Sequence, residues 1–146
     1  MTSRHSIVCA SYLILLRGDE VLLLERKNSG WMDGWYTFPA GHVEPHESPL
    51  ACMVREASEE LGIIVESEDL KLVHVMSRPD NEPDRIDFYF LAEKWEGEPE
   101  NLEPEKCGGL LWAPISDLPD NLIPSLRQAL DGYLSGLAYS ERSVET

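Results

Sequence analysis

Basic residues are scarce in this chain of 146 residues, which has 12 Lys and Arg against 27 Asp and Glu and a formal net charge of −15 at pH 7. Proteins that bind the nucleic-acid backbone need a basic surface, so this composition argues against a nucleic-acid polymer as partner. Cysteine is also rare, since Cys9, Cys52 and Cys107 are the whole set and lack the spacing of zinc ligands. Reduced thiols without a disulfide framework favour a cytoplasmic protein.

Long hydrophobic runs are missing as well. No apolar stretch approaches the roughly 20 residues of a membrane-spanning helix, and the start MTSRHSIVCA is too polar for a signal peptide. No repeat or low-complexity segment is present, and 146 residues correspond to one domain. We therefore expect a single domain over 1–146, with its core at 5–139 and a polar tail at 140–146. It should act away from membranes, as a monomer or homodimer.

Hydrophobic periodicity predicts a mixture of strands and two helices. Segments 7–16 and 21–25 are apolar and β-prone, and RGDE between them is typical of a hairpin. Residues 86–91 alternate with the period of a long strand, and shorter strands are expected at 36–38, 70–76 and 110–113. A helix is expected at 124–139, with an inward row formed by Leu126, Leu130, Leu134 and Leu137.

The most informative segment is 41–63, GHVEPHESPLACMVREASEELGI. Ser48 suits the N-cap of a helix, Pro49 its first position, and Gly62 the left-handed residue after its end. At about 100° per residue the apolar stripe and the acids of this helix lie on separate arcs. The stripe consists of Leu50, Val54, Ala57 and Leu61, and the acids are Glu56, Glu59 and Glu60.

Three carboxylates within five residues repel one another and destabilise the helix by about 0.2–0.5 kcal/mol for each like-charged pair. A solvated acidic face is one explanation for such a helix. The alternative is a site for a hard cation, because Mg²⁺ is held by a few carboxylates, waters and substrate phosphates.

The same segment matches every fixed position of the Nudix box. The spacing is Gly41, five residues, Glu47, seven residues, Arg55-Glu56, an apolar residue, any residue, Glu59-Glu60, any residue, Gly62 and an apolar residue. The chain therefore resembles the Nudix hydrolases. Outside the box, YTFPAG at 36–41 resembles the strand and turn that enter it, with Ala40 where glycine is usual. WEGEP at 95–99 resembles MutT-type enzymes, and NLEPEKC at 101–107 resembles a branch that hydrolyses nucleoside triphosphates.

This resemblance implies an α/β/α sandwich with a mixed sheet between helices, and a Mg²⁺-dependent hydrolase in which Mn²⁺ is an alternative ion. The implied metal ligands are Glu56, Glu59, Glu60, Glu103 and the carbonyl of Ala40. Arg55 is expected to orient the glutamates by a bidentate pair, supported by Gly41 and Glu47. A surface ion pair of Arg55 with Glu59, or a helix-dipole role for Glu47, would be simpler explanations.

The general base that activates water is either a box glutamate or an acid of the 95–109 loop. Glu103 aligns with the loop glutamate of MutT-type enzymes, and Asp84 and Asp87 are alternatives. Glycines and prolines in this loop suggest a lid over the metal site. Catalysis is thus expected from Glu56, Glu59, Arg55 and Glu103, whereas His42 and His46 should face solvent.

Substrate selection is set outside the box. Tyr89 and Trp112 are candidates for stacking on a base and Asn121 for contacting its edge, although most aromatics of a small sandwich belong to the core. The expected reaction converts a nucleoside triphosphate into the monophosphate and pyrophosphate. Pro79, sixteen residues after Ile63, favours an ADP-ribose or nucleotide-sugar pyrophosphatase instead. A third hypothesis is a non-catalytic nucleotide-sensing module.

Overall fold

A mixed sheet of eight strands forms the centre of the structure, a computed structural model that describes residues 4–79 and 81–143. The strands are β1 (Val8–Arg17), β2 (Glu20–Arg26), β3 (Tyr36–Thr37), β4 (Ala40–His42), β5 (Lys71–Arg78), β6 (Arg85–Ala92), β7 (Cys107–Pro114) and β8 (Tyr139–Glu141). They follow the order β3-β2-β1-β6-β5-β8, and β4 pairs with β1 and β7 with β2. The β1–β6 and β5–β8 pairs are parallel, whereas the other pairs are antiparallel.

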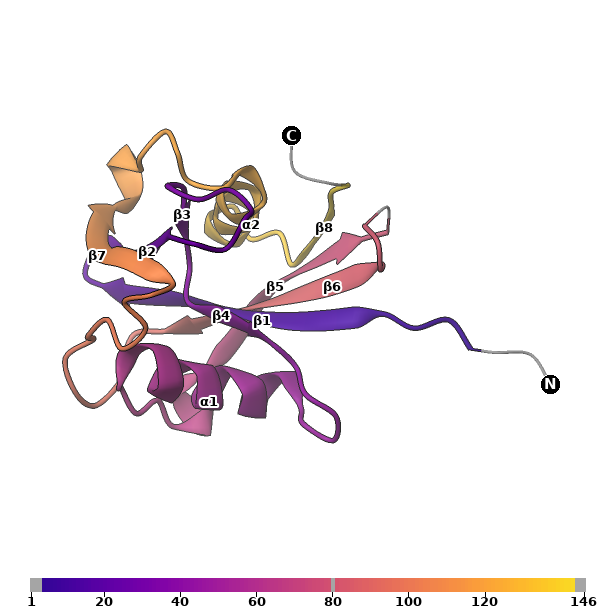
Figure 1. The fold of residues 1–146 in the computed structure, drawn as a ribbon, viewed down its shortest axis with the longest axis horizontal. Coiled ribbons are helices and arrows are strands. Elements are labelled where there is room, and N and C mark those ends of the chain that lie inside the picture. The colour runs from indigo at the N-terminus through magenta and orange to yellow at the C-terminus, as the bar shows by residue number, and fades with distance from the viewer. Residues whose placement is uncertain (1–3, 80, 144–146) are drawn as a thin grey trace.

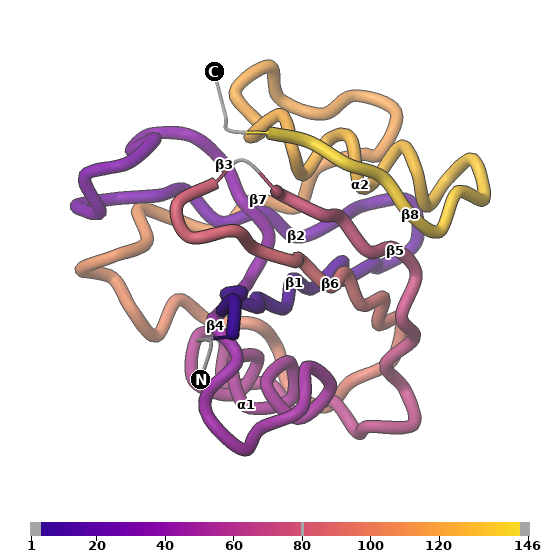
Figure 2. The backbone as a smooth tube through the Cα atoms, turned by 90° about the vertical axis from the view of Figure 1, so that its right-hand side faces the viewer, coloured from indigo at the N-terminus to yellow at the C-terminus, as the bar shows by residue number. Residues whose placement is uncertain are grey.

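Two helices cover the sheet from opposite sides. Helix α1 (Pro49–Leu61) lies below it and helix α2 (Pro124–Leu134) above it in Figure 1, and the turned view of Figure 2 shows the same layers. Short 3-10 helices, η1 (Ser67–Asp69) and η2 (Ile115–Asp117), lie in the connections. The α/β/α sandwich is therefore confirmed. Within the described ranges no helix is long and apolar enough to cross a membrane, and all three cysteines are free thiols.

The central strands are nearly all apolar because both faces of the sheet are covered. In β1, Leu13 and Leu15 pack into the cluster beneath α1, whereas Ile14 and Leu16 pack into the cluster beneath α2. This alternation is the two-residue period of a strand. It gives the molecule two cores, one on each side of a single sheet.

Helix α1 begins and ends where the sequence predicts. The Ser48 hydroxyl accepts the N–H of Ala51 at 3.0 Å, which caps the first turn. Gly62 is left-handed, with φ 69°, and its N–H donates to the carbonyl of Ser58. Local capping chemistry thus fixes the rotation and length of the helix that carries the acidic residues.

The segment between β6 and β7 is fastened to the end of α1. Ile64 and Glu96 exchange two backbone hydrogen bonds of 3.0 and 2.9 Å, and Leu102 N–H donates to the carbonyl of Glu60 at 3.1 Å. These bonds attach the segment to the end of α1, and the lid expected at 95–109 stays a prediction. The strand β7 also begins earlier than expected, at Cys107.

The end of the chain differs from the sequence prediction. Helix α2 stops at Leu134, and both Leu134 and Leu137 are exposed, at 52% and 54%, so neither belongs to the inward row. Gly136 is left-handed, with φ 78°, and lets the chain turn back along β5 to form β8. Ser140 and Glu141 are therefore part of the sheet and not of a polar tail. Residues 144–146 of that tail lie outside the described residues.

Polar contacts, which hydropathy does not reveal, hold this returning segment. His74 on β5 is 1% exposed, and its two ring nitrogens lie 2.8 Å from the Leu137 carbonyl and 2.7 Å from the Ser140 hydroxyl. Gly132 of α2 leaves room for the imidazole, because a Cβ at that position would lie 2.7 Å from His74 Cε1. The close approach of α2 to β5 therefore requires this glycine.

Candidate active site

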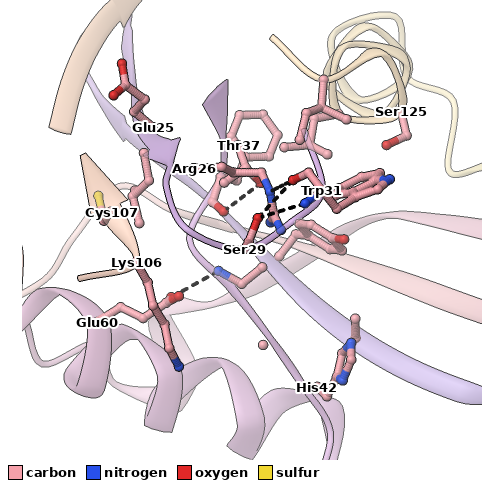
Figure 3. A pocket seen from close by; sticks show the side chains of 18 of the residues that line it. Glu25, Arg26, Ser29, Trp31, Thr37, His42, Glu60, Lys106, Cys107 and Ser125 are labelled. Atoms are coloured by element: carbon pink, nitrogen blue, oxygen red, sulfur yellow. Dashed lines mark hydrogen bonds between the residues drawn. The ribbon is translucent and has the colours of Figure 1, made fainter. Parts of the chain in front are cut away.

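A cavity of about 690 Å³ opens beside the start of the box (Figure 3). Glu60 and Lys106 lie at one end of it, and Trp31 and Ser125 lie at the other. The acidic end also includes Ala40, Gly41, Glu103 and Asn101 in its lining. The box, the 101–107 segment and the 27–35 loop thus all line the same cavity.

Arg55 is the centre of the charged groups on α1. Its Nε and Nη2 donate to the two carboxylate oxygens of Glu47 at 2.7 and 3.0 Å. Its Nη1 donates to Glu56 at 2.8 Å and to Glu59 at 3.1 Å. The hydrogen bonds from Arg55 lower the pKa of Glu47 to about 2, and the pairing with Glu47 raises the pKa of Arg55. Arg55 therefore holds several carboxylates at once, and its contacts go beyond a surface ion pair with Glu59.

Glu60 is a carboxylate without a cationic partner among the described residues. Burial, followed by the charges of Glu56 and Glu103, raises its pKa to about 9. Its carboxylate accepts a hydrogen bond of 3.0 Å from the Ala40 N–H. Burial also raises the pKa of Glu56, although Arg55 opposes this shift. Without a cation Glu60 is therefore protonated at neutral pH, and its ionised form requires positive charge that the described residues do not supply.

Gly41 leaves space for one of these carboxylates. A Cβ at Gly41 would lie 2.1 Å from Cδ of Glu56, so any side chain there would displace the Glu56 carboxyl group. Ala40, in the position where glycine is usual, needs no special backbone angle. The non-glycine residues of positive φ in the described part are Asn28, Met32 and His46.

The chemistry of this donor set fits a hard divalent cation. Carboxylate oxygens are the ligands that Mg²⁺ and Mn²⁺ prefer, and an ion would supply the missing positive charge. Across 4–79 and 81–143, no three His, Cys, Asp or Glu side chains are already grouped around one ion position. Glu59 is turned toward Arg55 and its side chain is 56% exposed. Glu56, Glu60 and Glu103 would hold the ion beside Ala40, with Glu59 at the outer edge.

Tyr89 does not lie in the cavity. It is 0% exposed, and its ring stacks on Tyr12 at a centroid distance of 4.9 Å. Tyr12 lines the cavity in its place. The register of the parallel β1–β6 pair sets Tyr12 opposite Tyr89, which no local pattern in the sequence reveals.

Trp112 and Asn121 are also placed elsewhere. Trp112 stacks on Trp95 at 6.2 Å and carries the guanidinium of Arg17 over its ring at 4.0 Å, outside the cavity lining. Asn121 donates its side-chain N–H to the carbonyl of Gly34 at 2.9 Å and fastens the loop before β3. The structure therefore brings together the box residues and Glu103, but not the residues expected to contact the base.

Several cavity residues escaped sequence analysis. Arg26, Arg78 and Arg85 lie on three strands, and Lys106 precedes β7. Trp31 was one of several aromatic residues suited to stacking on a base, but the sequence favoured Tyr89 and Trp112 over it. No local sequence pattern indicated the three arginines, because only the pairing of the strands brings them to the cavity.

Comparison with known proteins agrees with this geometry. The NUDIX domain model matches residues 7–133. Over 127 residues the chain is 28% identical to the uncharacterized Nudix hydrolase YvcI of Bacillus subtilis, covering 84% of this chain and 77% of that protein. Over 107 residues it is 34% identical to the NAD-capped RNA hydrolase NudC of Pseudomonas entomophila, covering 73% of this chain but 36% of that longer protein.

Among solved structures, the MutT NUDIX hydrolase of Burkholderia pseudomallei superposes with a TM-score of 0.78 and 29% identity, covering 86% of this chain and 97% of that one. The match of the domain model over most of the chain, the shared fold and the complete box agree. Nudix hydrolases generally use divalent metal ions and act on substrates in which a nucleoside diphosphate is linked to another group. The chain therefore belongs to the Nudix family.

Proposed function

We propose that this chain is a Mg²⁺-dependent nucleoside triphosphate diphosphatase that releases a nucleoside monophosphate and pyrophosphate. The observation that carries the proposal is the acidic end of the cavity, where Glu60 is buried beside Glu56 and Glu103 without a cationic partner among the described residues. The cavity of about 690 Å³ has the size of a small-molecule site. Trp31, 48% exposed at its other end, offers a surface for a base.

The proposed reaction is a displacement by water at the β-phosphorus. When bound, Mg²⁺ neutralises phosphate charge and polarises the phosphoryl oxygens. The bond between the β-phosphorus and the oxygen that bridges to the α-phosphorus breaks, and the monophosphate leaves with that oxygen. Arg55 would orient the carboxylates of Glu56 and Glu59 during this reaction, a role supported by its hydrogen bonds to both.

Glu103 is the proposed acceptor of the water proton. Its carboxylate makes no hydrogen bond or ion pair within the described ranges, whereas Glu56 and Glu59 are held by Arg55. Its backbone is fixed by a turn in which its carbonyl accepts the N–H groups of Lys106 and Cys107 at 2.9 and 2.8 Å. A positioned carboxylate with free lone pairs suits general-base catalysis.

A second candidate is a pyrophosphatase that acts on ADP-ribose, a nucleotide sugar or a dinucleotide. The spacing of Pro79 and the similarity to a protein named NAD-capped RNA hydrolase favour it. A third, a nucleotide-sensing module, would bind nucleotides without hydrolysis. The intact acidic group favours catalysis, because a sensor does not need it.

A nucleotide panel assayed with Mg²⁺ separates these candidates. We expect the common nucleoside triphosphates to give monophosphate and pyrophosphate in equal amounts. In ¹⁸O-labelled water the label should enter pyrophosphate, because water attacks the β-phosphorus. Inert triphosphates combined with turnover of ADP-ribose or NAD would replace our proposal with the second candidate. Binding without any hydrolysis would support the sensor.

Substitution of Gly41 by Ala tests the position of Glu56. The added Cβ would overlap the Glu56 carboxyl group, which must then swing away. Because a displacement of about 1 Å in an active site can cost about 100-fold in rate, we expect kcat to fall by that order. The melting temperature should change little, since the group that moves is the end of a flexible side chain. Gly109→Ala is the matched control, as nothing lies within 4 Å of its Cβ position. Unchanged turnover in Gly41→Ala would place Glu56 outside the reaction.

Glu60→Gln tests the buried charge in metal-free protein. The folded-state pKa is raised from 4.5 to about 9, so the folded state binds more protons than the unfolded state between these values. Stability should therefore fall as pH rises through this window, and the glutamine variant should not share this loss. We expect the variant to melt about 2–4 °C higher near pH 8, which corresponds to about 1 kcal/mol, and equally near pH 4. Glu105→Gln, at an exposed position, is the control. If Glu60→Gln and wild type have the same dependence of melting temperature on pH, the pKa of Glu60 is not raised by burial.

Glu103→Gln tests the proposed base. Loss of a general base should lower kcat by about 10²–10⁴-fold. The free energy of unfolding should stay within about 0.5 kcal/mol, as for most surface substitutions. Glu100→Gln, at an exposed position on the same segment, should behave like wild type in both measurements. If the two variants are indistinguishable in steady-state kinetics, a box glutamate is the base.

A further inference from the structure

A second group of charges lies across the sheet from the glutamates of α1. Asp87 of β6 is 0% exposed, and Arg85 donates to its Oδ1 through Nε and Nη2 at 3.1 and 3.0 Å. Arg78 of β5 donates to its Oδ2 at 3.4 Å. Strand alternation puts Asp87 on the same face as Tyr89, which belongs to the core beneath α2. Arg78 and Arg85 both line the cavity.

This group carries excess positive charge in a chain whose net charge is −15. Two guanidinium groups share the one carboxylate of Asp87. Burial of charge is unfavourable unless it is compensated, and a hydrophobic pair would fill the same space at lower cost. Arg78 also donates to the carbonyl oxygens of Arg142 and Ser143 and so fastens the segment after β8. Arg85 hydrogen-bonds only Asp87 and Tyr12 among the described residues, so folding explains Arg78 better than it explains Arg85.

Hydrogen-bond donors of this group remain unused. Arg85 is fixed through Nε and Nη2, and Nη2 also donates to the Tyr12 hydroxyl at 3.1 Å. The two N–H groups of Nη1 have no partner within residues 4–79 and 81–143, and the side chain is 22% exposed. Burial and Asp87 raise the pKa of Tyr12 to about 12, so that its hydroxyl stays protonated. This wall of the cavity thus offers donors to a ligand that brings acceptors.

A flat side chain stands in the same cavity. Trp31 lies in the 27–35 loop, and the guanidinium of Arg26 is 4.9 Å from its ring centroid. Asp33 holds the loop by accepting the N–H groups of Ser29 and Gly30 at 3.0 and 3.1 Å. A preset and exposed aromatic ring is a surface on which a nucleobase can stack.

We propose that Arg85, positioned by Asp87 and Tyr12, is the residue that determines base specificity and selects 6-oxopurines over adenine. Guanine and hypoxanthine present two adjacent acceptors, O6 and N7, to which the two N–H groups of Arg85 Nη1 can donate. Adenine presents an amino donor at position 6, which would face the donors of Arg85. This inference rests on the proposed function, since the base belongs to its nucleotide substrate.

The substrate itself provides the first test, without any change to the protein. We expect kcat/KM for GTP and ITP to exceed that for ATP by about 10–100-fold, as for one good bidentate contact. The analogue 7-deaza-GTP keeps O6 but lacks the N7 acceptor, so its kcat/KM should fall between those of GTP and ATP. Equal values for GTP and ATP, or faster hydrolysis of ATP, would overturn the proposal.

A second test changes the residue and keeps its charge. Arg85→Lys can still pair with Asp87, but its single ammonium nitrogen must then serve both Asp87 and the base. Its preference for GTP over ATP should fall below about 5-fold, mainly through a raised KM for GTP, while kcat/KM for ATP stays within about 3-fold of wild type. Arg127→Lys, outside the cavity lining, is the matched control. A purely structural role would instead lower the melting temperature and the turnover of both nucleotides alike, which would overturn the proposal.

Binding of the monophosphates keeps this test independent of catalysis. Calorimetric titration with GMP and AMP requires no turnover, and we expect GMP to bind at least about 10-fold more tightly to wild type and equally to Arg85→Lys. If no nucleotide is hydrolysed but this difference is present, the proposed function fails and the role of Arg85 stands. If GTP and ATP are hydrolysed equally and both monophosphates bind equally, the function stands and the role of Arg85 is refuted.

Discussion

The hydrogen bonds of Arg55 are the interaction on which the acidic site depends. Glutamates placed within one helical turn repel one another, and the single guanidinium of Arg55 contacts Glu47, Glu56 and Glu59. It also donates to the carbonyl of His42 at 3.3 Å, which joins α1 to the end of β4. Only a planar fork with five donors can serve so many acceptors in fixed directions, so lysine would not replace it. One side chain thus fixes the helix, the turn before it and the strand that enters the box.

Glu60 makes no contact with Arg55, and this is the second feature of the acidic site. Arg55 compensates the carboxylates at the outer edge of α1, whereas Glu60 is buried beside Glu56 and Glu103 with no cation of its own in the described part of the chain. An arrangement that folding alone would not favour is expected where function requires it. The acids of α1 are therefore not equivalent: Arg55 holds Glu56 and Glu59, whereas Glu60 has no cationic partner among the described residues.

The sequence predicted those features whose causes are local. Ser48 and Gly62 specify the ends of α1 through their own hydrogen bonds, and the apolar run of β1 indicates a strand buried on both faces. The length of α2 was wrong because Leu134 and Leu137 continue the helical period, while Gly136 permits the turn that returns the chain to β5. The partner of β8 is more than sixty residues away in the chain, so no local pattern could have shown it.

The site was predictable to the same extent. Resemblance in the box and in the 101–107 segment located the carboxylates, and the structure places Glu60 and Glu103 in one cavity. Aromatic character alone could not distinguish Tyr12 from Tyr89, because the register of β1 against β6 decides which ring reaches the cavity. Arg85 depends on the same register, since its fork is set by contacts with Asp87 on its own strand and Tyr12 on the neighbouring one.

Charged groups of both signs line the cavity. Carboxylates come from α1 on one side, whereas Arg78 and Arg85 come from strand positions that face α2 on the other. A nucleotide has a matching polarity, with phosphates that require a cation at one end and a base rich in acceptors at the other. The net charge of −15 opposes the approach of such an anion, but salt screens this repulsion beyond a Debye length of about 8 Å. Under the proposed function, orientation and selection of a nucleotide would therefore depend on the charges inside the cavity and not on the charge of the whole protein.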